Sequence, residues 1–547
     1  MPTAKLPAER VDVAARLRRT AAERPDHLAL RAGDARITYG ELHRSVDAAT
    51  AALQVRGVGP GTRVAFVLGT TPTFVEVAAA VLRTGAAMVP LLPGLAADEL
   101  RFAIADAGAE VVVVGPERLE ALAALRDALP DLRHLLAAGV SEEEIDRFDD
   151  APAAVTSWAA ACRDAAASGA PDRVERGSDD LAALVYTSGT TGRPRGAMLT
   201  RGNLAANQDQ SLAGRFQVGP DDVILLVLPL AHIYSLNVGL GASITAGATM
   251  VLVERFDPDA CLAAIEEHEV TVVLGAPPMY VAWVGGDALM RTDLSSIRLA
   301  VSGAAPLPVP VIERFRELTG ITIEEGYGLT EASPSVCATS MAECAVPGSV
   351  GLPLPDVEVR IVGEDGHDVD HGEDGELWVR GPNVFQGYWN DLQASEATLT
   401  PDGWLRTGDV AIRDEQGLVY LVDRLKDLVI VNGFNVYPRE VERVLLGSGV
   451  VAQAAVVGAP HPLTGETLVA YVVPLPEAEV DVDDLEARCR AELARYKCPS
   501  RIEVVDAVPT TATGKVRRRA LRGGGVSGAG GPVVGLVGPE AASEEEE

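Results

Sequence analysis

The chain has 547 residues, of which 47% are hydrophobic and 23% are charged, and its formal net charge at pH 7 is −31. This length exceeds what one compact core organises, so we expect two or more domains in a globular rather than a disordered protein. The negative charge argues against binding to nucleic acid or to anionic membrane surfaces, because both require clustered Lys and Arg.

The cysteines and the apolar segments indicate a cytoplasmic protein. Six cysteines are scattered without a C-x-x-C pair, as is typical of reduced thiols and not of a disulfide scaffold or a zinc site. The N-terminal residues lack the apolar core of a signal peptide. Residues 223–253 carry no formal charge, but Pro229, Asn237 and several glycines divide them into a strand, a loop, a buried helix and a second strand. We therefore expect no stable membrane insertion.

The larger part of the chain alternates between short strand-like runs and helical patterns. The runs are rich in β-branched residues and are bounded by Gly or Pro, and stretches rich in Ala and Glu with helical spacing lie between them. This alternation predicts mostly parallel sheets covered by helices on both faces. The clearest predicted strands are residues 111–115, 271–276 and 297–303, and the clearest predicted helices are residues 258–268 and 308–319.

The pattern changes near residue 350, where turn-punctuated alternating strands predict a small antiparallel or barrel-like β subdomain. A compact α+β pattern then follows a boundary near residues 423–427. We expect an α/β protein with a large N-terminal domain (1–423), a small C-terminal domain (424–522) and a disordered Gly-rich and acidic tail (523–547).

The segment YTSGTTGRPRG at residues 186–196 is the most informative single stretch. It follows an apolar strand-like run and combines hydroxyl groups with glycines, so that backbone N–H groups and side-chain donors can surround a phosphate chain. It is not a Walker A sequence, because no Gly-Lys-Ser/Thr closes it. The predicted phosphate-binding residues are Thr187, Ser188, Gly189, Thr190, Thr191 and Gly192.

Five further segments occur in a fixed order with this loop. They are SGAAPLP at 302–308, EEGYGLTE at 324–331, RTGDVA at 406–411, DRLKDLVIVNGFNVYPREVE at 423–442 and TATGKVRRRAL at 511–521. Together they closely resemble the adenylate-forming superfamily of acyl-CoA synthetases, firefly luciferase and peptide-synthetase adenylation domains, with features of fatty-acid–CoA and 4-coumarate–CoA ligases.

The resemblance implies a reaction in two steps. A carboxylic acid and MgATP give an acyl-adenylate and pyrophosphate, and the thiol of coenzyme A then displaces AMP to form a thioester. Delivery of the acyl group to the phosphopantetheine of an acyl carrier protein is the alternative second step. The resemblance also implies that the small domain is mobile and rotates between the two steps.

The nucleotide and metal residues are assigned by the same resemblance. Glu331 matches the magnesium position, Asp409 the acceptor for both ribose hydroxyls, and Arg424 a ribose or phosphate contact. Adenine is expected between an aromatic residue and a segment of small residues. The residues in question are Tyr327, Gly328 and Thr330 in the GYGLT segment, and Gly303, Ala304 and Ala305.

The catalytic and thiol-binding residues come from the C-terminal third. Lys515 is expected to bridge the substrate carboxylate and the α-phosphate in the first step, because a compact ammonium offsets charge between two anions. Lys426 matches the hinge position, and Gly433 matches the loop that lines the pantetheine tunnel. Arg195 stands where the family usually has Lys, so the charge is kept while the geometry differs.

The residues that bind the carboxylic acid are identified less clearly by the sequence than the nucleotide and catalytic residues. His232, in LPLAHIYSLN, matches a gate beside the acyl pocket, and this local sequence resembles the 4-coumarate branch. Val301 stands where that branch commonly has a lysine for the ring hydroxyl, so the pocket is expected to be mainly apolar. A medium- or long-chain fatty acid is the favoured substrate, and an aryl acid of the coumarate or cinnamate kind is the alternative.

Overall fold

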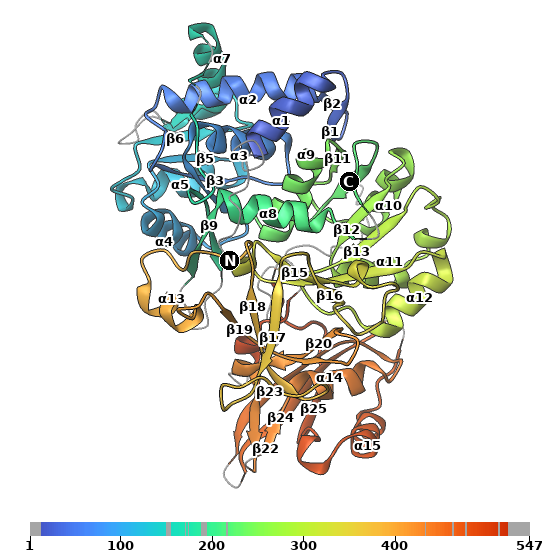
Figure 1. The fold of residues 1–547 in the computed structure, drawn as a ribbon. Helices are drawn as coiled ribbons and strands as arrows, with labels where there is room; N and C mark the ends of the chain where they lie inside the picture. The colour runs from blue at the N-terminus through green and yellow to red at the C-terminus, as the bar shows by residue number, and fades with distance from the viewer. Residues whose placement is uncertain are drawn as a thin grey trace, which may run out of the picture.

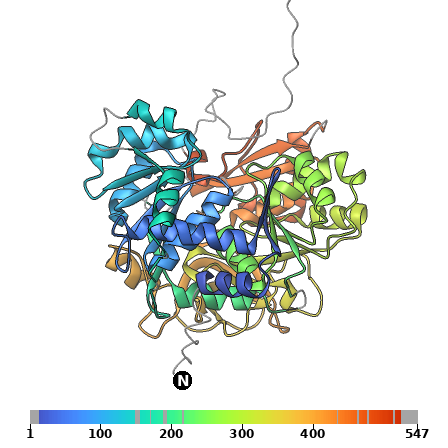
Figure 2. The same cartoon turned by 90° about the horizontal axis from the view of Figure 1, so that it is seen from above.

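The computed structural model describes residues 13–148, 155–169, 171–172, 174–187, 194–214, 217–432, 434–461, 464–475, 478–511 and 515–522. Figure 1 shows a larger part, coloured blue to yellow, above a smaller C-terminal part in orange to red. Seen from above in Figure 2, the cyan and the green portions of the larger part lie on either side of the blue N-terminal segments.

The first sheet has seven strands in the order β7-β6-β5-β3-β4-β8-β9, all parallel except for the antiparallel β8–β9 pair. Its strands are β3 (Arg63–Val67), β4 (Ala87–Leu91), β5 (Val111–Val114), β6 (His134–Ala137), β7 (Val155–Ser157), β8 (Leu181–Thr187) and β9 (Arg195–Thr200). The helices of this region are α2 (Tyr39–Gln54), α3 (Pro72–Thr84), α4 (Ala97–Ala107), α5 (Pro116–Ala124), α7 (Trp158–Ser168) and α8 (Arg201–Ser211).

The second sheet has nine strands in the order β16-β15-β14-β13-β12-β10-β11-β1-β2, and it is parallel from β14 to β1. The strands are β1 (Leu28–Ala32), β2 (Ala35–Thr38), β10 (Val223–Leu226), β11 (Thr249–Leu252), β12 (Val272–Gly275), β13 (Leu299–Ser302), β14 (Ile323–Gly328), β15 (Ser335–Ala338) and β16 (Leu352–Pro353). The helices of this region are α1 (Val13–Glu23), α9 (Ala242–Ala246), α10 (Pro258–Glu267), α11 (Pro277–Gly285) and α12 (Val309–Thr319).

Burial on both faces explains why these strands read as continuous apolar runs. Val111 and Val113 of β5 pack into a core that the two sheets share, whereas Val112 and Val114 pack against the opposite face of the first sheet. The second sheet follows the same rule: Val272 of β12 lies in the shared core, and its neighbour on the strand packs on the other face. The predicted strands and helices are confirmed at all five of the clearest segments.

A four-stranded antiparallel sheet follows, in the order β17-β18-β19-β20. Its strands are β17 (Glu358–Val362), β18 (Asp374–Arg380), β19 (Leu405–Arg413) and β20 (Val419–Arg424). The expected change to antiparallel strands is therefore confirmed. Strand β20 leads into the short helix η8 (Leu425–Asp427), which lies at the predicted domain boundary.

The small domain has one sheet of five strands, β21 (Val429–Val431), β22 (Phe434–Val436), β23 (Val451–His461), β24 (Gly465–Pro474) and β25 (Arg501–Val504). Helices α14 (Pro438–Leu446) and α15 (Val482–Glu492) cover one face, because their apolar side chains share a core cluster with the strands. Helix α16 (Arg518–Leu521) contributes Leu521 to a separate cluster on the other face. The expected α/β fold with a small α+β domain is confirmed.

The uncharged segment at 223–253 folds as expected into strand, loop, helix and strand, except that its helix begins with a π-helical stretch, η4 (Tyr234–Gly241), before α9. Within the described ranges, no helix is both long and apolar enough to span a bilayer.

Two glycines at positive φ allow the cost of an unfavourable backbone conformation to be distinguished from the cost of a steric clash. Gly33 and Gly351 have φ of 53° and 82°, and a Cβ added at Gly33 meets nothing within 4 Å, whereas one at Gly351 would lie 2.1 Å from the carbonyl oxygen of Ala338. We expect Gly33→Ala to cost about 1 kcal/mol of unfolding free energy, and Gly351→Ala to cost about 2 kcal/mol more because the backbone must move. Urea unfolding followed by circular dichroism measures both, and equal losses would contradict the steric argument.

Candidate active site

Two of the predicted segments lie at the carboxyl ends of parallel strands. Strands β13 and β14 are paired neighbours, with Ser302 opposite Glu325, so the segments that follow them lie side by side. In open α/β sheets this edge is where ligands bind. One continuous cleft is lined by the described members of the predicted set: Thr187, His232, Gly303, Ala304, Ala305, Tyr327, Gly328, Thr330, Glu331, Asp409, Arg424, Lys426 and Lys515.

Six predicted residues lie outside the described residues. They are Ser188, Gly189, Thr190, Thr191 and Gly192 of the phosphate loop, and Gly433 of the predicted pantetheine loop.

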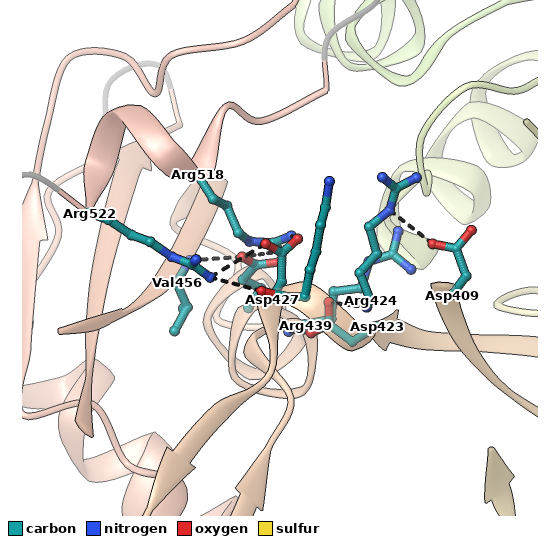
Figure 3. A network of polar contacts seen from close by, with 10 residues as sticks. Asp409, Asp423, Arg424, Asp427, Arg439, Val456, Arg518 and Arg522 are labelled. Carbon is teal, nitrogen blue, oxygen red and sulfur yellow. Dashed lines mark hydrogen bonds and ion pairs between the residues drawn. The ribbon is translucent and has the colours of Figure 1, made fainter. Parts of the chain in front are cut away.

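The carboxylate of Asp409 is buried and is held from two sides. The Tyr327 hydroxyl donates to Oδ2 at 2.7 Å, and Arg424 Nε lies 2.9 Å from Oδ1 (Figure 3). Burial and the adjoining Asp409 charge raise the pKa of Tyr327 well above its ordinary value, so the phenol remains a donor. Each carboxylate oxygen offers two lone pairs, so this arrangement leaves acceptor capacity for further donors on both oxygens.

The carboxylate of Glu331 is held by a residue that the sequence did not single out. The hydroxyl of Tyr388 donates to Glu331 Oε1 at 2.7 Å. The Arg195 guanidinium lies over the Tyr388 ring, 5.5 Å from its centroid, and Arg195 Nε also donates to Asp391 Oδ2 at 3.0 Å. The arginine that replaces the usual lysine thus packs against the tyrosine that orients Glu331, a contact for which a planar guanidinium is suited.

Lys515 enters the cleft from the small domain. Its backbone N–H donates to Thr511 Oγ1 at 3.1 Å, and its carbonyl accepts from the Thr511 N–H at 2.8 Å. Burial first and the Arg424 charge second lower the pKa of the Lys515 ammonium to about 7, while Asp409 acts in the opposite direction. A lysine with such a pKa gains or loses its charge according to what binds beside it.

His232 lies close enough to Lys515 to sense its charge. Burial first and the Lys515 ammonium second lower the pKa of His232 to about 4. Nδ1 accepts the backbone N–H of Tyr234 at 3.3 Å, which leaves Nε2 as the protonated nitrogen of a neutral ring. At neutral pH this histidine is therefore an uncharged donor.

A polar network ties the Lys515 segment to the domain boundary (Figure 3). Arg518 is the first residue of α16, three positions after Lys515. It binds both carboxylate oxygens of buried Glu442, at 2.7 and 2.8 Å, and Asp427 Oδ2 at 3.2 Å. Asp423 accepts the Arg439 backbone N–H at 2.8 Å. The end of β20, η8, α14 and α16 are thereby held together.

One predicted glycine is required by the chain itself. A Cβ at Gly328 would lie 2.2 Å from the Pro334 carbonyl oxygen, whereas one at Gly303 would lie 3.1 Å from Cζ of the Tyr234 ring, a tight contact with a side chain. The glycine at position 328 is explained by packing alone, so it carries less information about a nucleotide than the sequence suggested.

The part of the cleft beside Val301 has an apolar lining, and we call this part the channel. Leu274 and Val301 are register partners on β12 and β13, and Val272 and Leu299 are partners two residues earlier on the same face. All four line the cleft, together with Ile224 of β10. Two residues along a strand span ~6.7 Å, so the lining extends by that distance past Val301 along the sheet.

The residues around Glu331 fit a magnesium ion that is held chiefly by phosphate oxygens. Among the residues that the structure describes, no group of three or more His, Cys, Asp or Glu side chains is arranged to hold a metal. Mg²⁺ commonly takes one or two carboxylates and completes its octahedron with water and substrate phosphates. A single oriented carboxylate is therefore sufficient.

Sequence reasoning missed Tyr388 and Arg439, both of which line the cleft. Tyr388 is an aromatic residue without local chemical context, and Arg439 is one of many charged residues on an amphipathic helix. Only the tertiary fold brings them to the site.

Comparisons with known proteins match nearly the whole chain. The family model described as AMP-binding enzyme matches residues 17–389, and that of the AMP-binding enzyme C-terminal domain matches residues 440–515. A feruloyl-CoA synthase from an Amycolatopsis species is 39% identical over 503 residues, which cover 91% of this chain and 96% of the relative. A long-chain-fatty-acid–CoA ligase from Bacillus subtilis is 34% identical over 518 residues, covering 92% of each.

A solved structure has the same arrangement of elements. The crystal structure of ATP-bound MatB from Rhodopseudomonas palustris is 32% identical, has a TM-score of 0.83, and covers 93% of this chain and 98% of its own.

The low pKa of His232 leads to a prediction that does not depend on activity. We expect the ring to stay neutral down to about pH 5, since its pKa is about 4. Lys515→Met removes a nearby positive charge and should raise that pKa, but to a value below 6.5 because burial is the larger cause. Nuclear magnetic resonance of ¹³C-labelled histidine, assigned with His232→Gln, measures the titration.

Lys497→Met is the control, because Lys497 pairs with Glu440 within the small domain at 2.7 Å. It should leave the His232 titration unchanged. A wild-type His232 that titrates near 6.5 would contradict the described burial.

Proposed function

The chain belongs to the AMP-binding enzyme family, and on that premise we propose that it is an ATP-dependent ligase that joins a fatty acid to coenzyme A. The acid is first activated as an acyl-adenylate with release of pyrophosphate, and the thiol then replaces AMP. The observation that carries the proposal is the meeting of Asp409, Glu331 and Lys515 in one cleft.

The first step joins two anions. A carboxylate oxygen of the acid attacks the α-phosphorus of ATP, a P–O bond forms, and the bond to the pyrophosphate group breaks. In our proposal the Lys515 ammonium lies between the carboxylate and the α-phosphate. Its pKa of about 7 in the empty cleft rises when both anions bind, since each favours the charged form.

The nucleotide is positioned by residues of the large part. Asp409 would accept both ribose hydroxyls through its remaining lone pairs, while Tyr327 and Arg424 keep the carboxylate fixed. Glu331, oriented by Tyr388, would hold Mg²⁺, which when bound neutralises phosphate charge. Thr187 at the end of β8 leads into the loop proposed for the outer phosphates.

The second step replaces an oxygen ester by a thioester. The sulfur of coenzyme A attacks the acyl carbon as the thiolate, the C–S bond forms, and AMP leaves with the electron pair of the broken C–O bond. We propose that the boundary at residues 423–427 lets the small domain rotate at Lys426 before this step, which withdraws Lys515 from the cleft. Neutral His232 would donate from Nε2 beside the acyl carbonyl.

The channel past Val301 supports a medium- or long-chain fatty acid. Its lining by Val272, Leu299 and Ile224 is apolar and extends ~6.7 Å past Val301 along the sheet. The buried Glu324 on β14, which is the register partner of Val301 and also lines the cleft, accepts a hydrogen bond from Thr339 Oγ1. The alternative, an aryl acid of the cinnamate kind, is supported by the relative named as feruloyl-CoA synthase. A carrier-protein thiol remains the alternative acceptor.

Half-reaction assays test the role of Lys515. We expect Lys515→Ala to lower acid-dependent pyrophosphate release by roughly 10²–10³-fold, as the loss of a transition-state charge partner does. Thioester formation from preformed acyl-adenylate and coenzyme A should stay within about threefold, because the lysine is absent from the cleft in that step. Equal losses in both half-reactions would rule out this division of roles.

A narrowed channel distinguishes the two acid classes. We expect Leu299→Phe to lower kcat/KM at least about tenfold for decanoate and longer acids, because the added ring volume blocks the deep part of the channel. Butyrate, which does not reach Leu299, should be affected less than about threefold. The measurement is pyrophosphate release over a panel of fatty, cinnamic and benzoic acids with and without coenzyme A. A wild-type preference for cinnamic acids would overturn the fatty-acid assignment.

A further inference from the structure

Arg439 is a cation in the cleft that the assigned roles do not use. It is the second residue of α14, where its backbone N–H donates to Asp423 Oδ2. Its side chain lines the cleft, and the Asp409 carboxylate is close enough for its charge to raise the pKa of the Arg439 guanidinium. It therefore approaches the ribose-side carboxylate from the small domain, as Lys515 does.

The guanidinium of Arg439 has no partner among the residues that the structure describes: it forms neither an ion pair nor a hydrogen bond there. Arg424 differs, since its Nε binds Asp409, and Arg518 differs, since it binds Glu442 and Asp427. A guanidinium stays charged in proteins, and partial burial without a partner costs free energy.

The charges near Arg439 are mixed, and those near Lys515 are mainly positive. Burial is the main cause that lowers the pKa of Arg439, and the Asp423 and Glu442 carboxylates act in the opposite direction. At Lys515, the cations Arg424, Lys426 and Arg439 each lower the pKa of the ammonium, so they repel it across the cleft. A doubly or more negatively charged ligand between them would remove this repulsion.

We propose that Arg439 is a further nucleotide-binding residue, which grips a phosphate of ATP together with Lys515 in the domain arrangement described here. This inference rests on the proposed adenylating function. Because Arg439 belongs to the small domain, its contact would be made during adenylate formation and lost after rotation.

A phosphate suits this position better than the substrate carboxylate. The carboxylate must lie where the acyl channel opens, beside Val301 and His232, whereas Arg439 is close enough to Asp409 to sense its charge. A guanidinium also presents two parallel N–H donors that match two phosphate oxygens.

The decisive experiment compares the two half-reactions in variants of the full chain. Arg439→Met keeps the side-chain length and removes the charge, and Arg439→Lys keeps the charge and removes the fork. We expect Arg439→Met to lower kcat/KM for ATP in pyrophosphate release about 10- to 100-fold, as the loss of a charged hydrogen bond does. Arg439→Lys should recover part of that loss, and transfer from preformed acyl-adenylate to coenzyme A should change less than about threefold.

Arg490→Met is the matched control, because it removes one positive charge from the exposed side of α15 in the same domain. It should leave both half-reactions unchanged. Thermal unfolding of each variant identifies a folding defect, and Arg439→Gln replaces Arg439→Met if the latter does not fold.

Two results would overturn the inference. In the first, Arg439→Met keeps the wild-type kcat/KM for ATP although Lys515→Ala loses adenylation. This result would refute the role of Arg439 and leave the proposed function intact. The other is an equal loss in both half-reactions, which indicates a structural role. If Lys515→Ala itself adenylates normally, the proposed function fails and Arg439 has no adenylation step to serve.

Discussion

The buried carboxylate of Asp409 is the contact on which the arrangement of the cleft depends. It joins Tyr327 on β14 of the nine-stranded sheet to Arg424 at the end of β20, and so connects a parallel sheet with the strand that enters the small domain. A carboxylate in this position is costly unless its oxygens are paired, and removal of one partner leaves an uncompensated charge. The two donors therefore fix both the side chain and the relative position of the elements that carry them.

The small domain presents its cations as a single unit. Arg518 binds Glu442 and Asp427, which links the segment after Lys515 to α14 and to η8 at the boundary (Figure 3). Arg439 begins the same α14, and its backbone is bound to Asp423 at the end of β20. Lys515 and Arg439 thus lie in segments that Arg518 links to each other, so a rotation about Lys426 that keeps these links moves both together and breaks the contact of Arg439 with Asp423.

The sequence predicted the fold well where burial determines the pattern. Residues 111–115 and 271–276 read as strands because both faces are buried, and the structure places each face in a different core cluster. The π-helical start at Tyr234–Gly241 could not be predicted, since its apolar composition suits several helical forms. For the site, the ordered motifs predicted thirteen of the described residues that line the cleft. Tyr388 and Arg439 were missed because their roles come from contacts between segments far apart in the chain.

The positive charge of the cleft gives a physical reason for two domain arrangements. Burial is the largest cause of the lowered pKa of Lys515, and repulsion from Arg424 and Arg439 adds to it. ATP would supply the missing negative charge and favour the arrangement in which the small domain closes. After pyrophosphate leaves, less negative charge remains to hold the cations, so the balance shifts away from closure. The release of pyrophosphate would in this way weaken the contacts that hold the small domain in the cleft, and the second step requires these contacts to break.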